Sequence, residues 1–281
     1  MLEKRLLVVS GKGGVGKSAV AAALGQLAAR KGKRVLLMDM GNSGGLAAHL
    51  GTGPLEFEPR EVRNGISAMR IVRSDALLEY LTIQLSLRGL NRFGALARAF
   101  DALATAAPAI REIVTMGKVL WEVREQHWDL VIADAPPTGQ IGSFLRAPTS
   151  ISELVPTGRI QRQAAWMTHT LKDPSTTHLI LVNLAEELPT TETIQTLGWL
   201  EENELVPPPS VLTNRILDDL QTDPAGEGPI LEAAVHHRSV YSEQQEWLEN
   251  LTPDIKLPFL FGLLTPPEVS ARLGEILEGA L

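Results

Sequence analysis

A short glycine-rich segment constrains this chain more than any other part of its sequence. Residues 11–18 read Gly-Lys-Gly-Gly-Val-Gly-Lys-Ser and follow the apolar run Leu6–Val9 after one residue, Ser10. The pattern fits G-x-x-x-x-G-K-[ST], a loop whose glycines let backbone N–H groups turn inward around phosphate oxygens. In such a loop Lys17 reaches the β- and γ-phosphates, and the Ser18 hydroxyl can ligate Mg²⁺. The helix that follows adds the positive end of its dipole, so the segment predicts a nucleoside triphosphate site.

The second residue of this segment, Lys12, is an additional lysine that the phosphate-binding pattern does not require. A lysine so early in the loop points away from the phosphates of its own subunit. It can instead neutralise charge on a nucleotide bound by a partner subunit, as an arginine finger supplied in trans does. Lys12 therefore predicts a dimer, and with Lys17 it is a candidate catalytic residue.

Apolar runs recur at long intervals along the chain, with segments of helical character between them. We expect strands at residues 5–10, 34–39, 66–72, 129–134, 178–183, 210–214 and 255–258, and helices that include 17–31, 190–202 and 229–248. Most of these runs show no alternation, as expected of parallel strands that are buried on both faces. The order predicts an α/β fold with a mostly parallel P-loop NTPase sheet and helices on both of its faces.

One interval of the chain carries no strand signal. Between Val72 and Asp129 apolar residues recur at helical spacing, which predicts a helical subdomain at about residues 75–127 within a single domain over residues 1–281. A second helical stretch is expected at about residues 149–172. The apolar stripes of the insert pack on each other and on the sheet, or they open a groove for a hydrophobic segment of another protein. We favour the first interpretation, because apolar helical stripes usually belong to a core.

The composition excludes several classes of site. The chain has 281 residues, a net charge of −7 and no cysteine. The lack of cysteine rules out thiolate metal centres and fits a reducing compartment. The negative charge, without a dense Lys/Arg cluster, disfavours nucleic acid as a partner. Because the N-terminal apolar run is too short for a signal peptide or a membrane span, we expect a cytoplasmic protein with no stable membrane anchor.

A second motif makes the function class more specific. The apolar run Val131–Ala133 ends at Asp134, and residues 135–140 read Ala-Pro-Pro-Thr-Gly-Gln. This segment resembles the switch II element D-x-A-P-T-G-H of the ArsA family, with Pro136 where that consensus has alanine. The loop at 11–18 is similar to the deviant Walker A sequence of the same family, G-K-G-G-V-G-K-[ST]. The resemblance extends through nearly the whole chain, which looks most like actinobacterial-type ArsA-like proteins encoded as paralogous pairs.

The resemblance to this family of ATPases implies ATP and Mg²⁺ as ligands, in a homodimer or in a heterodimer with a paralogue. It implies that Asp39 and Asp134 support Mg²⁺ together with Ser18, partly through water. It also implies that Asn214 recognises adenine and that Pro258 packs beside it. The nucleotide-binding residues expected on this basis are Gly11, Lys12, Gly13, Gly14, Val15, Gly16, Lys17, Ser18, Ala19, Asn214 and Pro258.

The sequence departs from the family pattern at three points. Gly41 stands where switch I has an aspartate that orients the attacking water, and glycine has no side chain for this task. Asn42 and Ser43 lack the expected spacing, whereas Gln140, in place of histidine, can orient a water. The absence of cysteine disfavours an arsenite role, because arsenite binds thiolates, and it also removes the zinc clamp of the eukaryotic-type relatives.

Three functions are compatible with these residues. The first is a dimeric ArsA-like ATPase with catalytic residues Lys12, Lys17, Asp39, Asp134 and Gln140. Its region 134–146 would pass the nucleotide state to a hydrophobic or membrane-protein client, in targeting, transport or assembly. The second, motivated by Gly41, is a nucleotide-sensing subunit of a hetero-pair with weak hydrolysis or none. The third is a MinD- or ParA-like positioning ATPase, which the acidic segment 267–278 disfavours because membrane-binding helices of that kind are basic.

Overall fold

The fold is built on one eight-stranded sheet with the strand order β3-β4-β2-β5-β1-β6-β7-β8. The computed structural model describes residues 1–281 except 42–43, 86–107, 156 and 221–227. The strands are β1 (Leu6–Gly11), β2 (Val35–Asp39), β3 (Arg60–Arg63), β4 (Ile66–Arg70), β5 (Leu130–Asp134), β6 (Thr177–Leu184), β7 (Ser210–Ile216) and β8 (Ile255–Pro258). Every neighbouring pair is parallel except β3 and β4. The predicted α/β fold with a mostly parallel sheet is therefore confirmed.

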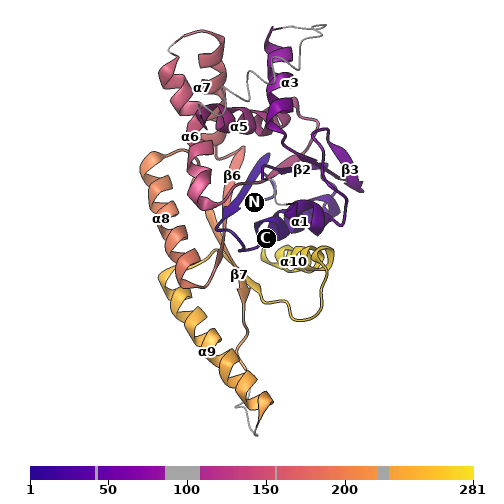
Figure 1. Ribbon diagram of the computed structural model, residues 1–281, viewed down its shortest axis with the longest axis vertical. Coiled ribbons are helices and arrows are strands. Elements are labelled where there is room, and N and C mark those ends of the chain that lie inside the picture. Colours follow the sequence, from indigo (N-terminus) through magenta and orange to yellow (C-terminus); the bar gives the residue numbers. More distant parts are fainter. Residues whose placement is uncertain (42–43, 86–107, 156, 221–227) are drawn as a thin grey trace.

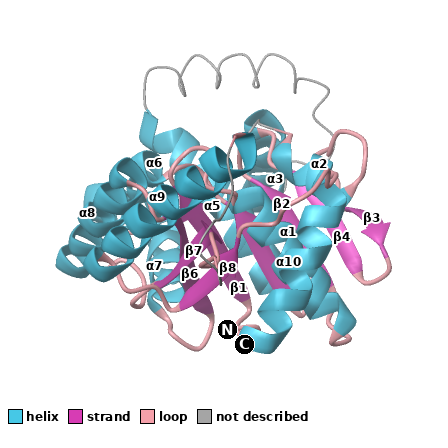
Figure 2. Ribbon diagram, turned by 90° about the horizontal axis from the view of Figure 1, so that it is seen from below, coloured by secondary structure: helices cyan, strands magenta, loops and turns pink. Residues whose placement is uncertain are grey.

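Helices cover both faces of this sheet (Figure 1, Figure 2). They are α1 (Lys17–Arg30), α2 (Gly45–Leu50), α3 (Arg73–Leu85), α5 (Pro108–Glu125), α6 (Thr138–Leu154), α7 (Arg159–Lys172), α8 (Glu187–Asn203), α9 (Pro229–Asn250) and α10 (Pro266–Ala280). Buried side chains of α1, α2 and α10 form one core cluster with the sheet. Those of α3 and of α5 to α8 form a second cluster on the opposite face.

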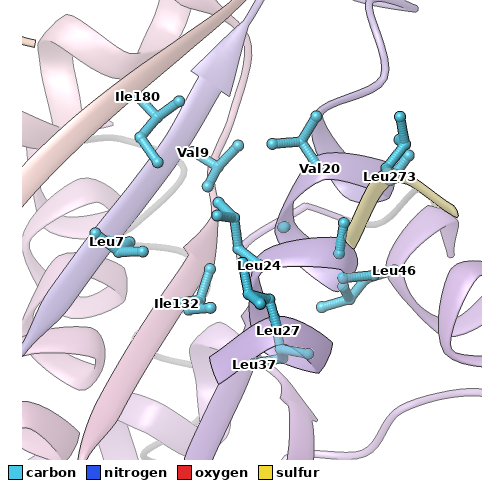
Figure 3. Close-up of a cluster of buried hydrophobic side chains, with 14 of the residues drawn as sticks. Leu7, Val9, Val20, Leu24, Leu27, Leu37, Leu46, Ile132, Ile180 and Leu273 are labelled. Carbon is cyan, nitrogen blue, oxygen red and sulfur yellow. The ribbon is translucent and has the colours of Figure 1, made fainter. Parts of the chain in front are cut away.

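Strand β1 shows why the predicted strands lack alternation. Leu7 and Val9 point into the cluster that contains Leu24 of α1 (Figure 3). Leu6 and Val8 point into the other cluster, where Leu120 of α5 lies. Each of these side chains is fully buried. Both faces of the strand are therefore covered, and the four positions from Leu6 to Val9 are all apolar, as in other parallel sheets.

Two elements were not expected from the sequence. The antiparallel edge strand β3 is made of charged and largely exposed residues (Arg60, Glu61 and Arg63), so it carries no apolar run. Charged residues on an edge strand also oppose pairing with further chains. The short helix α2 follows Gly44, whose φ of 67° lies in the left-handed region, and its six residues are too few for a periodic pattern.

The helical segments differ from the expected ranges in their boundaries. Instead of one stretch at about 149–172, α6 starts at Thr138 and ends at Leu154, and α7 starts at Arg159. Gly158, with a φ of 103°, lies at the break between them. Within the expected subdomain at 75–127, α3 and α5 are described and residues 86–107 are not.

The C-terminal helix α10 packs against α1 and α2. Its buried residues Leu273 and Leu277 belong to the same core cluster as α1. Ser270 donates a hydrogen bond to the His49 carbonyl at 2.8 Å, and the His49 Nδ1 lies 2.8 Å from the Pro266 carbonyl oxygen. Of the helices in the described ranges, none combines the length and apolar character that a membrane span requires.

Burial of His49 predicts a pH-dependent stability, although the contact with the Pro266 carbonyl opposes the shift. Burial lowers the pKa of His49, so the unfolded chain binds a proton at a pH where the folded chain does not. Stability linked to this histidine is therefore present above its unfolded pKa, near 6.5, and is lost as the pH falls below it. We expect the Tm of thermal unfolding to fall between pH 7.5 and pH 5.5, and to fall by a smaller amount in His49→Gln than in the wild type.

The matched control is His236→Gln, on the exposed side of α9. The Tm of this variant should fall by the same amount as that of the wild type over the same pH range. An equal loss for His49→Gln and the wild type would contradict the linkage.

Candidate nucleotide site

The glycine-rich loop connects β1 to α1 and lies against the neighbouring strand. Gly11 has a φ of 147°, and an added Cβ would be 2.1 Å from the Val182 carbonyl oxygen of β6. Gly16 has a φ of 99°, and a Cβ there would be 2.5 Å from the Asn214 Nδ2 atom. Both positions therefore require glycine, for their backbone conformation and for the close approach of their neighbours.

Positive groups gather where α1 begins. Gly16 precedes the helix, and no side chain caps the first N–H groups of α1. Such a helix start attracts anions through its N–H groups and its dipole. Lys17 folds back over the loop, where its Nζ atom donates a hydrogen bond to the Lys12 carbonyl at 3.0 Å. Burial lowers the pKa of Lys17, although the charges of Asp134 and Glu192 oppose this shift.

Two carboxylates meet at the carboxyl edge of the sheet, beside the loop. Because β2 and β5 are parallel and in register, Asp39 lies opposite Asp134. The Ser18 hydroxyl donates a hydrogen bond to Asp134 Oδ2 at 2.6 Å. Burial and the charge of Asp39 raise the pKa of Asp134 to about 6. Burial also raises the pKa of Asp39, although the Gly41 N–H donates to its Oδ1 at 2.8 Å.

This set of oxygens fits a hard divalent cation. Both carboxylates have raised pKa values because burial disfavours their ionised forms, although the charge of Lys17 acts on Asp134 and that of Arg70 on Asp39 in the opposite direction. In the part of the chain that the structure describes, no three acidic or histidine side chains converge to make a complete metal cage. Mg²⁺ suits such a site, because it usually keeps several waters and binds one or two carboxylates. Ser18, Asp39 and Asp134 would hold it, and it would supply positive charge beside the phosphates.

Glu192 of α8 is part of the site, and the sequence did not indicate it. Its Oε2 atom lies 2.8 Å from Lys12 Nζ, and Thr138 at the start of α6 donates a hydrogen bond to its Oε1. No sequence motif includes Glu192, so no local pattern indicated its place in the site. A second contact was also not expected: Ser10 of β1 donates to the Pro136 carbonyl at 2.6 Å and ties the loop after β5 to the strand before the phosphate loop.

Asn214, near the end of β7, supports the phosphate loop through a side-chain hydrogen bond. Its Nδ2 donates to the Val15 carbonyl at 3.0 Å, and its Oδ1 accepts the Arg215 N–H at 2.9 Å. Pro258 ends the adjacent strand β8, opposite Ile216. The structure therefore places Asn214 against the loop and Pro258 on the neighbouring strand, and their role toward adenine stays a prediction.

The remaining expected residues lie at the edge of the site. Ala19 has its side chain in the core, so only its backbone can face a ligand. Gln140 is exposed in the first turn of α6, and its backbone N–H donates to the Pro137 carbonyl at 2.7 Å. Gly41 lies two residues after Asp39, and among the described residues a Cβ at this position would meet Asp39 Oδ1 alone, at 3.4 Å. Asn42 and Ser43 lie outside the described residues.

An apolar cavity of about 240 Å³ lies between α3, α5, α6 and α7, the helices at the top of Figure 1. Its lining residues are Ala76, Leu77, Glu79, Tyr80, Ile113, Val114, Gly117, Lys118, Trp121, Ile151, Ile160, Gln163, Ala164 and Met167. Lys118, which is almost fully buried, forms ion pairs with Glu79 at 2.7 Å and with Glu122 at 2.8 Å. The cavity wall therefore combines a largely apolar surface with one compensated charge cluster.

Comparison with known proteins decides the family. Residues 4–167 match the model of the anion-transporting ATPases, ArsA. This chain belongs to the ArsA family of ATPases. The matched range contains the loop at 11–18, Asp39 and the segment 134–140 of this ArsA-family protein, whereas Asn214 and Pro258 lie beyond it.

Individual relatives of this ArsA-family chain carry three different names. It is 34% identical over 226 residues to ATPase BagA of Mycobacterium tuberculosis, which covers 75% of the chain and 65% of BagA. It is 25% identical over 288 residues to a protein of Halobacterium salinarum named as a putative arsenical pump-driving ATPase. This match covers 95% of the chain and 42% of the relative. It is 29% identical over 154 residues to ATPase get3 of Neurospora crassa. This match covers 53% of the chain and 44% of the relative. The chain thus spans about two thirds of the first relative's length.

The buried hydrogen bond from Asn214 to the loop predicts the effect of removing it. Asn214→Ala leaves the Val15 carbonyl without this donor, so we expect a stability loss of about 1–2 kcal/mol. A less rigid loop should also bind a non-hydrolysable ATP analogue about 5- to 10-fold more weakly, measured by calorimetry.

The control for this experiment is Asn250→Ala, which removes an exposed hydrogen bond to the Glu246 carbonyl at the end of α9 and should change neither quantity. Unchanged analogue affinity in Asn214→Ala would show that the hydrogen bond does not support the loop.

Proposed function

We propose that this chain binds ATP with Mg²⁺, hydrolyses it as a dimer and passes its nucleotide state to a hydrophobic client. The observation that carries the proposal is the contact of the Ser18 hydroxyl with Asp134, beside Asp39 and at the start of α1. A phosphate loop, a hydroxyl and two acids on adjacent strand ends are the parts that position a nucleoside triphosphate and its metal. Membership of a family of ATPases supports the same reaction.

Each residue of the site has a separate role in this proposal. Lys17 and the N–H groups of the loop bind the β- and γ-phosphates, and they neutralise charge that develops as the terminal phosphate leaves. Ser18, Asp39 and Asp134 hold the metal. Lys12 reaches the nucleotide of a partner subunit. Gln140 is the candidate for orienting the attacking water, because it is exposed in the first turn of α6.

Helix α6 is the proposed link between the nucleotide and the client. Its first residue, Thr138, is bonded to Glu192 beside the phosphate loop. Thirteen residues later, Ile151 lines the apolar cavity. Helices shift as rigid units between two packings, so a movement at Thr138 reaches the cavity wall.

A hydrophobic or membrane-protein client fits the cavity better than an anion does. The lining is mostly apolar, and its one charge cluster is already paired. The relatives include an arsenical pump-driving ATPase and ATPase get3, but the lack of cysteine disfavours arsenite here. We infer targeting, transport or assembly of such a client in the cytoplasm, by a homodimer or a heterodimer with a paralogue. A MinD-like membrane anchor finds no support in α10, whose apolar face packs on α1.

The first test is metal-dependent turnover. We expect the purified chain to release phosphate from ATP with Mg²⁺ and to stop when EDTA removes the metal. Lys17→Ala should lower turnover by about 10²-fold or more, because it removes a charge that acts on the leaving phosphate. Lys31→Ala, at the exposed end of α1, should match the wild type. Turnover that survives either EDTA or Lys17→Ala would contradict the proposed site.

A second candidate function, a nucleotide-sensing subunit with little or no hydrolysis, rests on Gly41. Within the described part of the chain, the space beside Gly41 admits a side chain, since an added Cβ meets one atom there, at ordinary contact distance. In the same assay Gly41→Asp therefore should raise the turnover of a weakly active wild type, about 10-fold or more, if alignment of the water is limiting. Gly41→Asn is the uncharged control of similar shape. Robust wild-type turnover that Gly41→Asp does not raise would exclude this candidate.

The proposed link through α6 predicts that nucleotide changes the cavity. The dye anilinonaphthalene sulfonate should bind the wild type with different affinity in the presence and absence of a non-hydrolysable ATP analogue. Gly117→Leu adds a side chain at the cavity wall near Met167 and should weaken dye binding without changing analogue affinity. Gly198→Leu, where a side chain meets open space on α8, is the matched control. Dye affinity that is the same with and without nucleotide would contradict the link.

A further inference from the structure

Glu192 joins three separate parts of the molecule around one carboxylate. Its Oε2 atom pairs with Lys12 of the phosphate loop at 2.8 Å. Its Oε1 atom accepts a hydrogen bond from Thr138, the first residue of α6. The backbone N–H of Gly139 contacts the same carboxylate, and these contacts lower the pKa of Glu192. One side chain of α8 therefore fixes both the loop lysine and the start of α6.

The pair with Glu192 determines where the Lys12 charge lies. Lys12 and Glu192 are each about one-third exposed, so the pair lies at the surface next to the phosphate loop. An ammonium group that is held at 2.8 Å from a carboxylate within its own subunit is directed toward α8. Any anion that takes Lys12 must compete with this carboxylate, and at an exposed site the pair is weak enough to exchange.

Helices α6 and α8 are also fitted together beyond Glu192. Gly142 of α6 faces Trp199 of α8, where an added Cβ would lie 2.9 Å from the indole ring. One turn further along α6, the Arg146 guanidinium lies 5.5 Å from the centre of the same ring. Thr138, Gly142 and Arg146 recur every four residues and so form one face of α6. Glu192 therefore holds the end of this face that lies nearest to Lys12.

We propose that Glu192 is a positioning residue that holds Lys12 within its own subunit, and that Lys12 must leave Glu192 before it can meet the phosphates of a partner's nucleotide. The part of this inference that concerns the partner rests on the proposed dimeric function. Of the contacts that the described residues make with the Glu192 carboxylate, release of Lys12 leaves those with α6, so the same event changes how α8 holds Thr138. Glu192 thereby couples the arrival of a partner nucleotide to the start of α6.

The reactivity of Lys12 tests the holding contact without a dimer or a nucleotide. The monomeric chain is treated with acetic anhydride, and acetylation of Lys12 is followed by mass spectrometry of the peptide that contains it. Glu192→Gln keeps the shape of the side chain and removes its charge, and should raise the acetylation rate of Lys12 about 2- to 5-fold. Glu187→Gln, an exposed acid in the first turn of α8, is the control and should leave the rate unchanged. A Lys12 rate in Glu192→Gln equal to that of the wild type would overturn the proposal.

Dimerisation tests the release step. With a non-hydrolysable ATP analogue and Mg²⁺, light scattering over a concentration series should give Glu192→Gln a dimer dissociation constant about 2- to 5-fold below that of the wild type. The gain should vanish in a Lys12→Ala background, since the effect acts through Lys12. Equal gains in both backgrounds, or weaker dimerisation of Glu192→Gln, would overturn the release step.

The two measurements also separate this inference from the proposed function. If the wild type forms no dimer with the analogue, the dimeric function and the release step both fail, while the acetylation rate still decides whether Glu192 holds Lys12.

Discussion

The parallel register of β1, β5 and β2 is the constraint on which the site depends. It aligns Val9 with Asp134 and Asp134 with Asp39, so both acids end at one edge of the sheet where the phosphate loop leaves β1. Ser18 then needs only the first turn of α1 to reach Asp134. A shift of one residue between β2 and β5 would turn Asp39 to the opposite face and separate the two carboxylates. The cores on both faces of the sheet hold this register in place.

In the proposed function, the site offers more groups for binding a nucleotide than for attacking it with water. Lys17, the start of α1 and the Ser18–Asp134 contact are the groups proposed to act on phosphate and metal. Gly41 has no side chain for positioning a water, and its backbone N–H donates to Asp39 Oδ1. Electrostatic stabilisation and alignment of the nucleophile are separable contributions to phosphoryl transfer. Electrostatic stabilisation can therefore remain when alignment of the nucleophile is reduced. Nucleotide binding without hydrolysis is enough to shift a protein between two conformations.

Helix α6 gives the site a physical connection to the rest of the molecule. One end contacts Glu192 and the loop that Ser10 holds, and the other end lines the cavity. Between these ends, the fit of Gly142 against Trp199 leaves little space for α6 and α8 to slide independently. Closely packed helices exchange between discrete arrangements, which is the basis of the proposed link from the phosphate loop to the cavity.

Local patterns in the sequence determined the phosphate loop, the acid at the end of β5 and most of the parallel strands. These features depend on neighbouring residues, such as the glycines at 11–16 and the apolar run before Asp134, so they can be predicted from the order of residues. Only the tertiary structure decided that Glu192, 180 positions from Lys12, is its partner and that Asn214 braces the loop at Val15. The edge strand β3 escaped prediction because it is mostly charged and has no apolar run. The early start of α6 also escaped prediction: Ile141, Phe144 and Leu145 recur at helical spacing, but two glycines and Pro148 in the same segment disfavour a helix. Contacts of this kind join residues far apart in the chain, and no local pattern records which surfaces the fold will bring together.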